Sequence, residues 1–256
     1  MTQKTHGTRR IGCAGWTIPR ESRPAFPEEG SHLERYAAVF GMVEINTSFY
    51  RPHKPQTYAR WAGSVPSDFR FAVKLPRSIS HDARLSGTDE PLAQFAGEVG
   101  ALGDKLGCVL VQLPFKLEFD AGVANEFFAR ALGSFACMLA CEARHPSWFG
   151  PEASALLTAR GITRVIADPP AGQPGPHEPT TAAIYARLHG SPRVYYSSYP
   201  DDYLEKMAAD MAVHAAAGRD VWCVFDNTAS GAAVPNALVL RSAGGIRTAQ
   251  YPGHRA

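Results

Sequence analysis

The sequence lacks the features that mark secreted and membrane-spanning proteins. Its five cysteines include no C-x-x-C pair and are odd in number, so we expect buried, small hydrophobic side chains rather than a disulfide framework. No apolar run approaches the ~20 residues of a membrane span. The chain begins with MTQKTHGTRR, which is polar and basic and does not resemble the apolar core of a signal peptide. We therefore expect a cytoplasmic protein with no membrane association.

The sequence also lacks a large excess of either charge. Its 26 Lys and Arg residues nearly balance its 24 Asp and Glu residues, which gives a net charge of +2. Nucleic-acid binding usually requires a concentrated basic face, so a nucleic-acid partner is an open alternative that the net charge does not indicate. Hydrophobic residues make up 45% of the chain, which is ample for a sizeable core. The composition does not indicate the oligomeric state.

Short β-branched runs alternate with longer helical patterns along the chain. Candidate strands are Arg10–Ala14, Met42–Asn46, Phe69–Lys74, Cys108–Gln112, Met138–Glu142, Arg164–Asp168, Ile184–His189 and Val221–Asp226. Candidate helices are Leu33–Phe40, Leu92–Leu106, Val123–Leu132, Glu152–Arg160 and Asp202–Ala217. This alternation is typical of repeated βαβ units and a parallel sheet. The sequence predicts an α/β fold, a (β/α)8 TIM-type barrel in a single domain over residues 10–245, with a flexible N-terminal tail at 1–9 and a C-terminal tail at 246–256.

Polar side chains gather at the C-terminal ends of the predicted strands. Side chains two residues apart share one face of a strand, and one face of most of these strands begins apolar or small and ends polar. The polar ends are Glu44, Lys74, Gln112, Glu142, Arg144, Asp168, Arg187, His189 and Asp226. Barrel enzymes hold their catalytic groups at this end of the strands. We expect these side chains to converge in one concave mouth; a purely structural network of ion pairs is the alternative interpretation.

Several longer stretches resemble the YecE-like family. They are IGCAGW, LERYAAVFGMVEINTSFYR, FRFAVKLPRSISH, KLGCVLVQLP, CEARHPSWF, YARLHG and FDNTASGAAVPNA, and they extend from about Ile11 to Leu240. The resemblance implies a TIM-barrel-like fold and no established reaction. It marks as signature positions Glu44, Asn46, Phe49, Tyr50, Lys74, His81, Gln112, Glu142, Arg144, His145, Arg187, His189, Gly190, Asn227 and Thr228. Relatives often carry asparagine at the position of Asp226, which weakens the case for proton transfer by that residue.

The mixture of charges predicts an enzyme that acts on a small anionic ligand, such as a phosphorylated metabolite or a nucleotide, by acid/base chemistry of the hydrolase or lyase type. Close carboxylates in a mixed field acquire separated pKa values, and arginine suits phosphate or carboxylate oxygens. The predicted catalytic residues are Glu44, Lys74, Glu142, Asp168 and His189. The predicted substrate-binding residues are Trp16, Asn46, Tyr50, His81, Gln112, Arg144, Arg187, Tyr199, Asp226 and Asn227. Among these, Arg144 and Arg187 would clamp the anion, and the tyrosine-rich segment 191–203 would cover it.

A sharper variant of this hypothesis gives Lys74 a Schiff-base role, because a lysine on a barrel strand can attack a carbonyl when its pKa falls. Nearby carboxylates are expected to keep the amine of Lys74 protonated instead.

Two further classes of function stay open. A metal-dependent phosphodiester hydrolase could use Glu44, Glu142, Asp168 and His189 as ligands, although the sequence contains no H-x-H or H-E-x-x-H spacing. A non-catalytic protein that binds a small anion would carry the same pocket. The sequence requires no cofactor and does not indicate whether a metal is bound.

Overall fold

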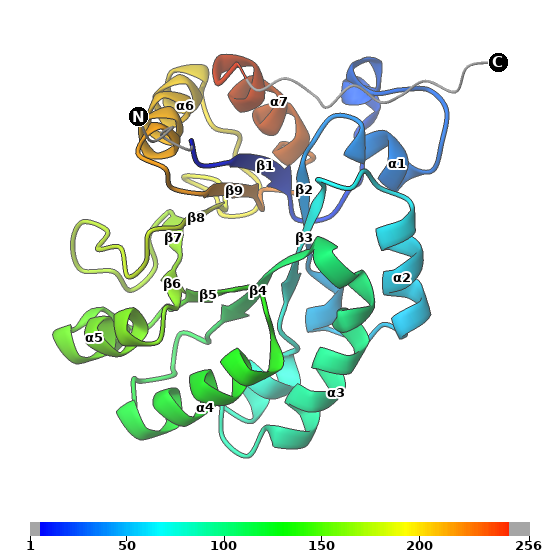
Figure 1. Cartoon of the computed structure of the whole chain (residues 1–256). Coiled ribbons are helices and arrows are strands. Elements are labelled where there is room, and N and C mark those ends of the chain that lie inside the picture. The colour runs from blue at the N-terminus through cyan, green and yellow to red at the C-terminus, as the bar shows by residue number, and fades with distance from the viewer. Residues whose placement is uncertain (1–5, 246–256) are drawn as a thin grey trace, which may run out of the picture.

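The structure is a computed structural model that describes residues 6–245 of the 256-residue chain. Parallel strands occupy the middle of the molecule, and helices surround them (Figure 1). Residues 1–5 and 246–256 of the predicted tails lie outside the described residues. The first strand, β1 (Arg9–Cys13), begins at Arg9. The chain therefore has an α/β fold.

The described strands form two parallel sheets. The remaining strands are β2 (Met42–Ile45), β3 (Arg70–Lys74), β4 (Leu106–Gln112), β5 (Met138–Glu142), β6 (Thr163–Arg164), β7 (Ile166–Asp168), β8 (Ile184–Leu188) and β9 (Val221–Phe225). One sheet has the order β1-β9-β8-β7, and the other has the order β2-β3-β4-β5-β6. Each predicted strand is present close to its expected bounds, except that the sixth is divided at Val165 into β6 and β7.

The two sheets meet along β1 and β2. Ala14 and Glu44 form a single parallel bridge, and the Gly15 N–H donates to the Glu44 carbonyl at 2.9 Å. The Tyr36 hydroxyl accepts from the Cys13 N–H at 2.7 Å and donates to the Met42 carbonyl at 3.2 Å. On the other side, the chain passes directly from β6 in one sheet to β7 in the other. The closed barrel predicted from the sequence is therefore not present as one continuous ladder of strands among residues 6–245.

Helices connect most of the strands. They are α1 (His32–Ala37), α2 (Pro55–Gly63), α3 (Asp89–Val99), α4 (Ala121–Ser134), α5 (Pro151–Ala159), α6 (Asp201–Ala216) and α7 (Ala233–Ala243). Local capping explains some of the helix starts. Ser31 and Glu34 form a capping box at α1, and the Asp120 side chain accepts from the Val123 N–H at α4. The connection between β7 and β8 contains no helix, because prolines and glycines interrupt it. Between residues 6 and 245, no helix combines the length and apolar character needed to cross a membrane.

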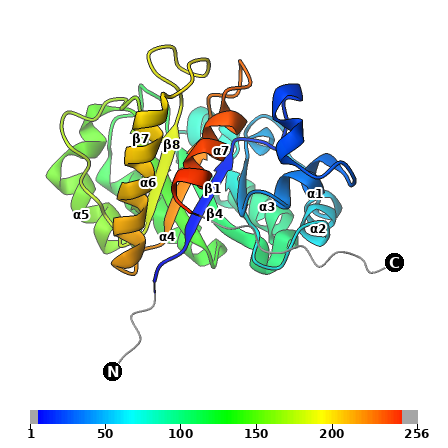
Figure 2. The ribbon, with the colours of Figure 1, turned by 90° about the horizontal axis from the view of Figure 1, so that it is seen from above.

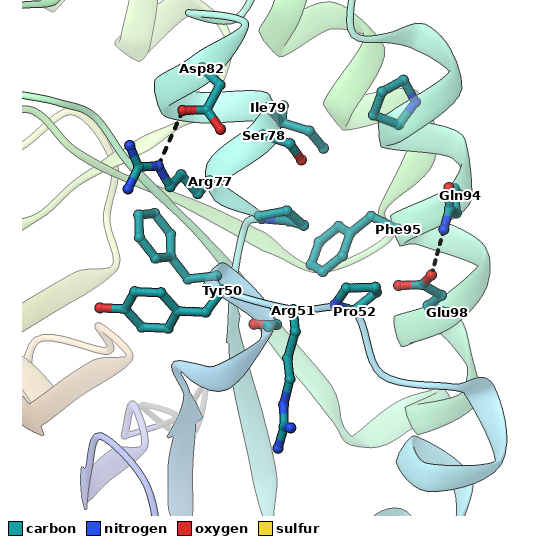
Figure 3. A pocket seen from close by; sticks show the side chains of 14 residues that line it. Tyr50, Arg51, Pro52, Arg77, Ser78, Ile79, Asp82, Gln94, Phe95 and Glu98 are labelled. Atoms are coloured by element: carbon teal, nitrogen blue, oxygen red, sulfur yellow. Dashed lines mark hydrogen bonds and ion pairs between the residues drawn. The ribbon is translucent and has the colours of Figure 1, made fainter.

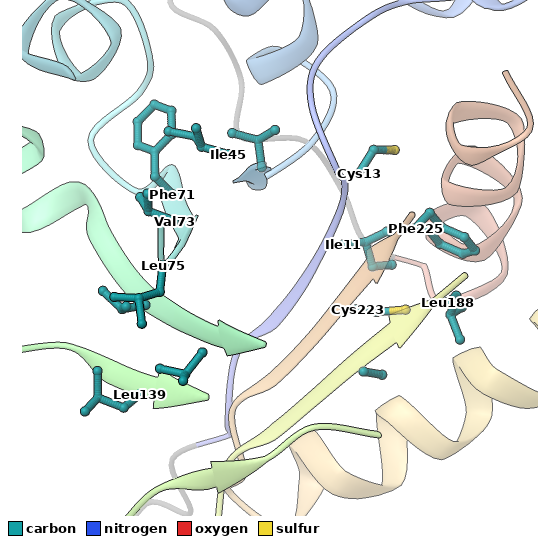
Figure 4. Close-up of a cluster of buried hydrophobic side chains, with 14 of the residues drawn as sticks. Ile11, Cys13, Ile45, Phe71, Val73, Leu75, Leu139, Leu188, Cys223 and Phe225 are labelled. Atoms are coloured by element: carbon teal, nitrogen blue, oxygen red, sulfur yellow. The ribbon is translucent and has the colours of Figure 1, made fainter. Parts of the chain in front are cut away.

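Apolar side chains on the two faces of the strands form separate clusters. Residues of one face, including Ile11, Val73, Leu139 and Phe225, pack with the surrounding helices (Figure 4). Helices α6 and α7 pack against each other and against β1 and β9 (Figure 2). Residues of the other face form an inner cluster of Met42, Ala72, Cys108, Leu110, Ala140, Val165, Tyr185, Trp222 and Val224. The polar strand ends lie two residues beyond members of this inner cluster.

Candidate active site

A layer of buried polar side chains continues the inner face of both sheets. Its members are Glu44, Lys74, Gln112, Glu142, Arg187, His189 and Asp226, each at most 8% exposed. They come from the ends of β2, β3, β4, β5, β8 and β9. The two-residue period of a strand places each of them on the same face as the inner cluster. We refer to this group as the polar layer.

Arg187 lies at the centre of the polar layer and is fully buried. Its Nε and Nη2 donate to Glu44 Oε2 and Oε1 at 3.1 and 2.6 Å. Nη2 also donates to Asp226 Oδ2 at 2.9 Å, and Nη1 donates to Glu142 Oε2. Burial disfavours the charged guanidinium, but the three carboxylates outweigh this effect and hold the pKa of Arg187 well above its ordinary value.

These contacts change the role predicted for Arg187. The side chain is 0% exposed, and its guanidinium already serves three carboxylates of the protein. It has no free edge with which to clamp an anion. Arg187 instead fixes the positions of Glu44, Glu142 and Asp226 relative to one another.

Glu142 makes the widest set of contacts among the carboxylates. Besides Arg187, it accepts from Gln112 Nε2 at 3.2 Å and from Arg144 Nη2 at 2.9 Å. Its Oε1 also lies 3.2 Å from His189 Nε2. Burial alone would raise the pKa of Glu142, but Arg187, His189 and Arg144 outweigh burial and hold that pKa well below 4.5. Glu142 is therefore a stable carboxylate rather than a proton donor in this state.

His189 lies between two carboxylates. Its Nδ1 is 3.0 Å from Asp226 Oδ2, while its Nε2 faces Glu142. Burial lowers the pKa of His189, but the hydrogen bonds to Asp226 and Glu142 prevail and raise it above 6.5. The ring can therefore hold a proton near neutral pH. Asn46 completes this side of the layer, with Nδ2 donating to Asp226 Oδ1 at 3.3 Å.

Lys74 differs from the other charged members of the polar layer. Its Nζ lies 4.2 Å from the centre of the Phe49 ring, and no hydrogen bond or ion pair of its ammonium group is found within residues 6–245. Burial, followed by the charge of Arg187, lowers the pKa of Lys74 from 10.5 to about 8, although Glu44, Glu142 and Asp226 act in the opposite direction. Glu44, Glu142 and Asp226 thus favour the protonated amine, as expected from the sequence, but burial and Arg187 outweigh them and lower the pKa of Lys74.

Lys74 and Arg144 both act electrostatically on His81. Arg144 donates through Nε and Nη2 to one oxygen of Glu142, and its guanidinium lies 4.9 Å from the Phe115 ring centre. His81 packs edge-on against Phe49 at 5.0 Å. Burial lowers the pKa of His81, and the positive charges of Lys74, Arg144 and Arg77 lower it further. The positive charges of Lys74, Arg144 and Arg77 together outweigh the opposing effect of Asp82 on the pKa of His81.

Asp168 is not brought into the polar layer. The Tyr199 and Tyr203 hydroxyls donate to its two carboxylate oxygens at 2.8 and 3.0 Å. The inner cluster contains Val165 from this part of the chain, so Asp168, three residues later, falls on the opposite face of the strand. The expectation that Asp168 shares the common mouth is corrected by this placement.

Four other predicted site residues lie apart from the polar layer. Trp16 packs edge-on against Trp61 of α2 at 5.1 Å between ring centres. Tyr199 binds Asp168, and its hydroxyl also accepts from the Gly190 N–H. Asn227 donates to the Ser197 carbonyl and to Asn236 Oδ1. Tyr50 is 79% exposed. Trp16, Tyr199 and Asn227 thus hold loops in place around the site.

Two residues of the site were not predicted as members. The Tyr185 hydroxyl donates to Glu44 Oε2 at 2.8 Å, and Phe49 lies under Lys74 Nζ. Tyr185 could have been found, because it lies two residues before Arg187 on the same face of one strand. Phe49 lies in a short 3-10 turn after β2, where no period of two or 3.6 residues applies.

A cavity of about 310 Å3 has Phe49, Tyr50 and Pro76 among its lining residues. Phe49 therefore contacts both this cavity and the ammonium group of Lys74. Arg77 and Asp82 form a 3.1 Å ion pair on one side, and Gln94 donates to Glu98 on another (Figure 3). Tyr50, predicted to bind substrate, belongs to this cavity.

The polar layer does not form a metal centre. Such a centre needs several His, Cys, Asp or Glu donors directed at one point, and residues 6–245 contain no group of three or more with this arrangement. Glu44, Glu142 and Asp226 all direct oxygens at the guanidinium of Arg187 instead. The donor set present therefore does not fit the metal-dependent hydrolase considered from the sequence.

Known proteins resemble this chain in sequence. Residues 10–255 match the family model described as "Protein of unknown function DUF72". The chain is 35% identical over 164 residues to the UPF0759 protein YecE of Escherichia coli strain K12, and this match covers 62% of the chain and 58% of that protein. It is 26% identical over 174 residues to the UPF0759 protein YunF of Bacillus subtilis strain 168, covering 62% and 60%. The matched segment thus spans about three fifths of the length of these curated relatives.

Solved structures resemble it in fold. A DUF72 family protein from Enterococcus faecalis V583 superposes with a TM-score of 0.79 at 20% identity, covering 94% of this chain and 97% of that one. A DUF72 family protein from Thermotoga maritima MSB8 gives a TM-score of 0.75 at 26% identity, covering 91% and 98%. Neither description states a reaction or a ligand.

Proposed function

We propose that this chain, which belongs to the DUF72 family of proteins of unknown function, is an enzyme that acts on a small anionic molecule by acid/base chemistry at the C-terminal ends of its strands. The ligand would carry a phosphate or carboxylate group. The observation that carries the proposal is the distribution of charge in and around the polar layer: the carboxylates turn toward the buried Arg187, while the positive charges of Lys74 and Arg144 both act on His81.

This distribution favours an anion for a physical reason. Three carboxylates that share Arg187 are already neutralised in part, so they repel an incoming anion less than free carboxylates would. Lys74 and Arg144 have donor groups that these carboxylates do not use fully, because Lys74 makes no described hydrogen bond and Arg144 directs only Nε and Nη2 at Glu142. A phosphate or carboxylate at this position would supply the missing acceptors.

Each polar residue then has a distinct role in the proposed reaction. Lys74 and Arg144 bind the anionic group, and His189 moves a proton. Glu142 and Asp226 orient the His189 ring through its two nitrogens. Arg187 acts as a positioning residue, since it is fully buried and its guanidinium donates to Glu44, Glu142 and Asp226.

We also propose that the two sheets together form a TIM-barrel-like arrangement. The Ala14–Glu44 bridge and the direct passage from β6 to β7 support it, because each joins the edge of one sheet to the edge of the other. In such an arrangement the polar layer lies at the end of the strands where barrel enzymes hold their active sites.

Calorimetric titration with inorganic pyrophosphate and with citrate tests the binding part of the proposal. Removing one charge-assisted contact costs ~1.5–3 kcal/mol, so Lys74→Gln and Arg144→Gln should each weaken binding by about tenfold or more. Arg60→Gln, an exposed change on α2, is the matched control and should leave the affinity unchanged. Equal affinities in all four proteins would exclude the anion site.

Turnover is tested separately with mixtures of phosphorylated and carboxylated metabolites, followed by proton and phosphorus NMR. Conversion by the wild-type protein that is lost in His189→Gln supports the enzymatic role. Tight binding with no conversion of any bound compound would favour the non-catalytic binding protein instead.

A further inference from the structure

Lys74 and Lys105 show two different environments for a lysine ammonium group. Lys105 is partly exposed, and its Nζ donates to the Ala62 and Val65 carbonyls, each at 2.6 Å. Lys74 is 7% exposed, and its Nζ lies over the face of the Phe49 ring. Within the described residues 6–245, its ammonium group makes no hydrogen bond. A lysine with a purely structural role is expected to donate hydrogen bonds as Lys105 does, and within that range Lys74 does not.

The groups that face Lys74 come from several elements. Arg187 from β8 and His81 from the turn after β3 are cationic, or become so on protonation, and disfavour a second positive charge. Glu44 from β2, Glu142 from β5 and Asp226 after β9 favour it, but all three are bound to Arg187. The balance, together with burial, lowers the pKa of Lys74 to about 8. A substantial fraction of the amine is therefore neutral just above neutral pH.

We propose that Lys74 is a nucleophile that condenses with the carbonyl group of a small anionic aldehyde or ketone to form an imine. The inference rests on the proposed function only for the anionic character of the substrate. The buried position, the amine without a described hydrogen bond and its place over the Phe49 ring carry the chemistry.

The step balances without an oxidant or a reductant. The nitrogen lone pair of the neutral amine attacks the carbonyl carbon, and the C=O π electrons move to oxygen. Both amine hydrogens then leave with that oxygen as water, and a C=N bond remains. Protonation of the imine makes it an electron sink, so the reaction class is a lyase-type cleavage or formation of a bond next to the carbonyl carbon.

The test traps the imine in the full-length protein. Glyoxylate, a small anionic aldehyde, is added with sodium cyanoborohydride at pH 7.5, and the adducts are located by intact mass and peptide mapping. An amine with a pKa of about 8 has about a hundredfold more neutral form at this pH than an ordinary lysine. Even with reduced access, Lys74 should therefore be modified at least tenfold faster than the exposed Lys206.

Variants and a second reagent make the outcome decisive. Lys74→Arg should lose the adduct, while Lys206→Arg should keep both the adduct and pyrophosphate binding. Acetaldehyde, which is neutral, should react at Lys74 more slowly than glyoxylate. Trinitrobenzenesulfonate, an anionic amine reagent, measures the reactivity of Lys74 with no carbonyl probe at all. If Lys74 reacts no faster than Lys206 with both glyoxylate and this reagent, the inference is overturned. If the wild-type protein does not bind pyrophosphate, the proposed function is overturned instead.

Discussion

A lysine that loses contact with water destabilises a folded protein unless other groups stabilise its charge. Lys74 is in this position, because burial lowers its pKa from 10.5 to about 8 against the opposing effect of three carboxylates. This change corresponds to a penalty of about 3 kcal/mol on the charged form. A residue that weakens the fold by this amount is expected at a site where the free amine is used.

The stability of a Lys74→Met variant should therefore exceed that of the wild-type protein at pH 7, by about 1–3 kcal/mol in urea unfolding. Below pH 8 the amine is protonated in both the folded and unfolded states, and the full penalty is present. Between pH 8 and 10.5 the unfolded chain binds more protons, so wild-type stability rises with pH and the advantage of the variant shrinks. An advantage that is absent at pH 7, or that grows toward pH 9.5, would contradict the assigned environment.

At the scale of elements, the sequence predicted the strands well because each has a run of apolar residues of the expected period. The same period correctly placed Glu44, Glu142 and Arg187 on one face. The period failed at Asp168, because the predicted strand is divided at Val165 into β6 and β7. Val165 faces the inner cluster, so Asp168, three residues later, lies on the opposite face from the one that the sequence predicted. Hydrogen-bond partners could not be predicted, since the period of a strand gives direction but not distance.

The proline- and glycine-rich connection between β7 and β8 supports the site from outside. Gly172 has a φ of +71°, and a Cβ atom placed there would lie 2.2 Å from the Arg144 carbonyl oxygen. The connection thus packs directly on the backbone that carries Arg144. This close approach requires a residue without a side chain, which glycine provides and a helix built of other residues would not.

Replacement of Gly172 by alanine should displace the backbone of Arg144 and weaken pyrophosphate binding by about tenfold, as loss of one charge-assisted contact would. Two controls separate the causes. Gly161 also has a positive φ, of +64°, but nothing lies within 4 Å of its added Cβ, so Gly161→Ala tests backbone strain alone. Gly175→Ala lies in the same connection, also with open space. Equal binding by the Gly172 and Gly161 variants would show that contact with Arg144 is unimportant.

At the scale of the whole molecule, the polar layer joins the two sheets. Arg187 and Asp226 belong to the sheet of β1, β7, β8 and β9, whereas Glu44 and Glu142 belong to the other. The ion pairs of Arg187 with Glu44 and Glu142 therefore cross between sheets. The geometry of the candidate site depends on how the sheets are held relative to each other, and the β1–β2 contact is one of the places that holds them.

Gly12 makes the close approach of β1 to β2 possible, because a Cβ atom there would lie 2.2 Å from the Met42 carbonyl oxygen. Gly12→Ala should force these strands apart, lower the free energy of unfolding by about 1–3 kcal/mol and move Glu44, two residues beyond Met42, away from Arg187. Pyrophosphate affinity should fall with stability, because the anion site is built from both sheets. Gly41→Ala, one residue before Met42 with nothing within 4 Å of the added Cβ, is the matched control. Urea unfolding and calorimetry on both variants measure the two effects; a Gly12 variant that loses stability and retains full affinity would show that the site does not depend on the contact between the sheets.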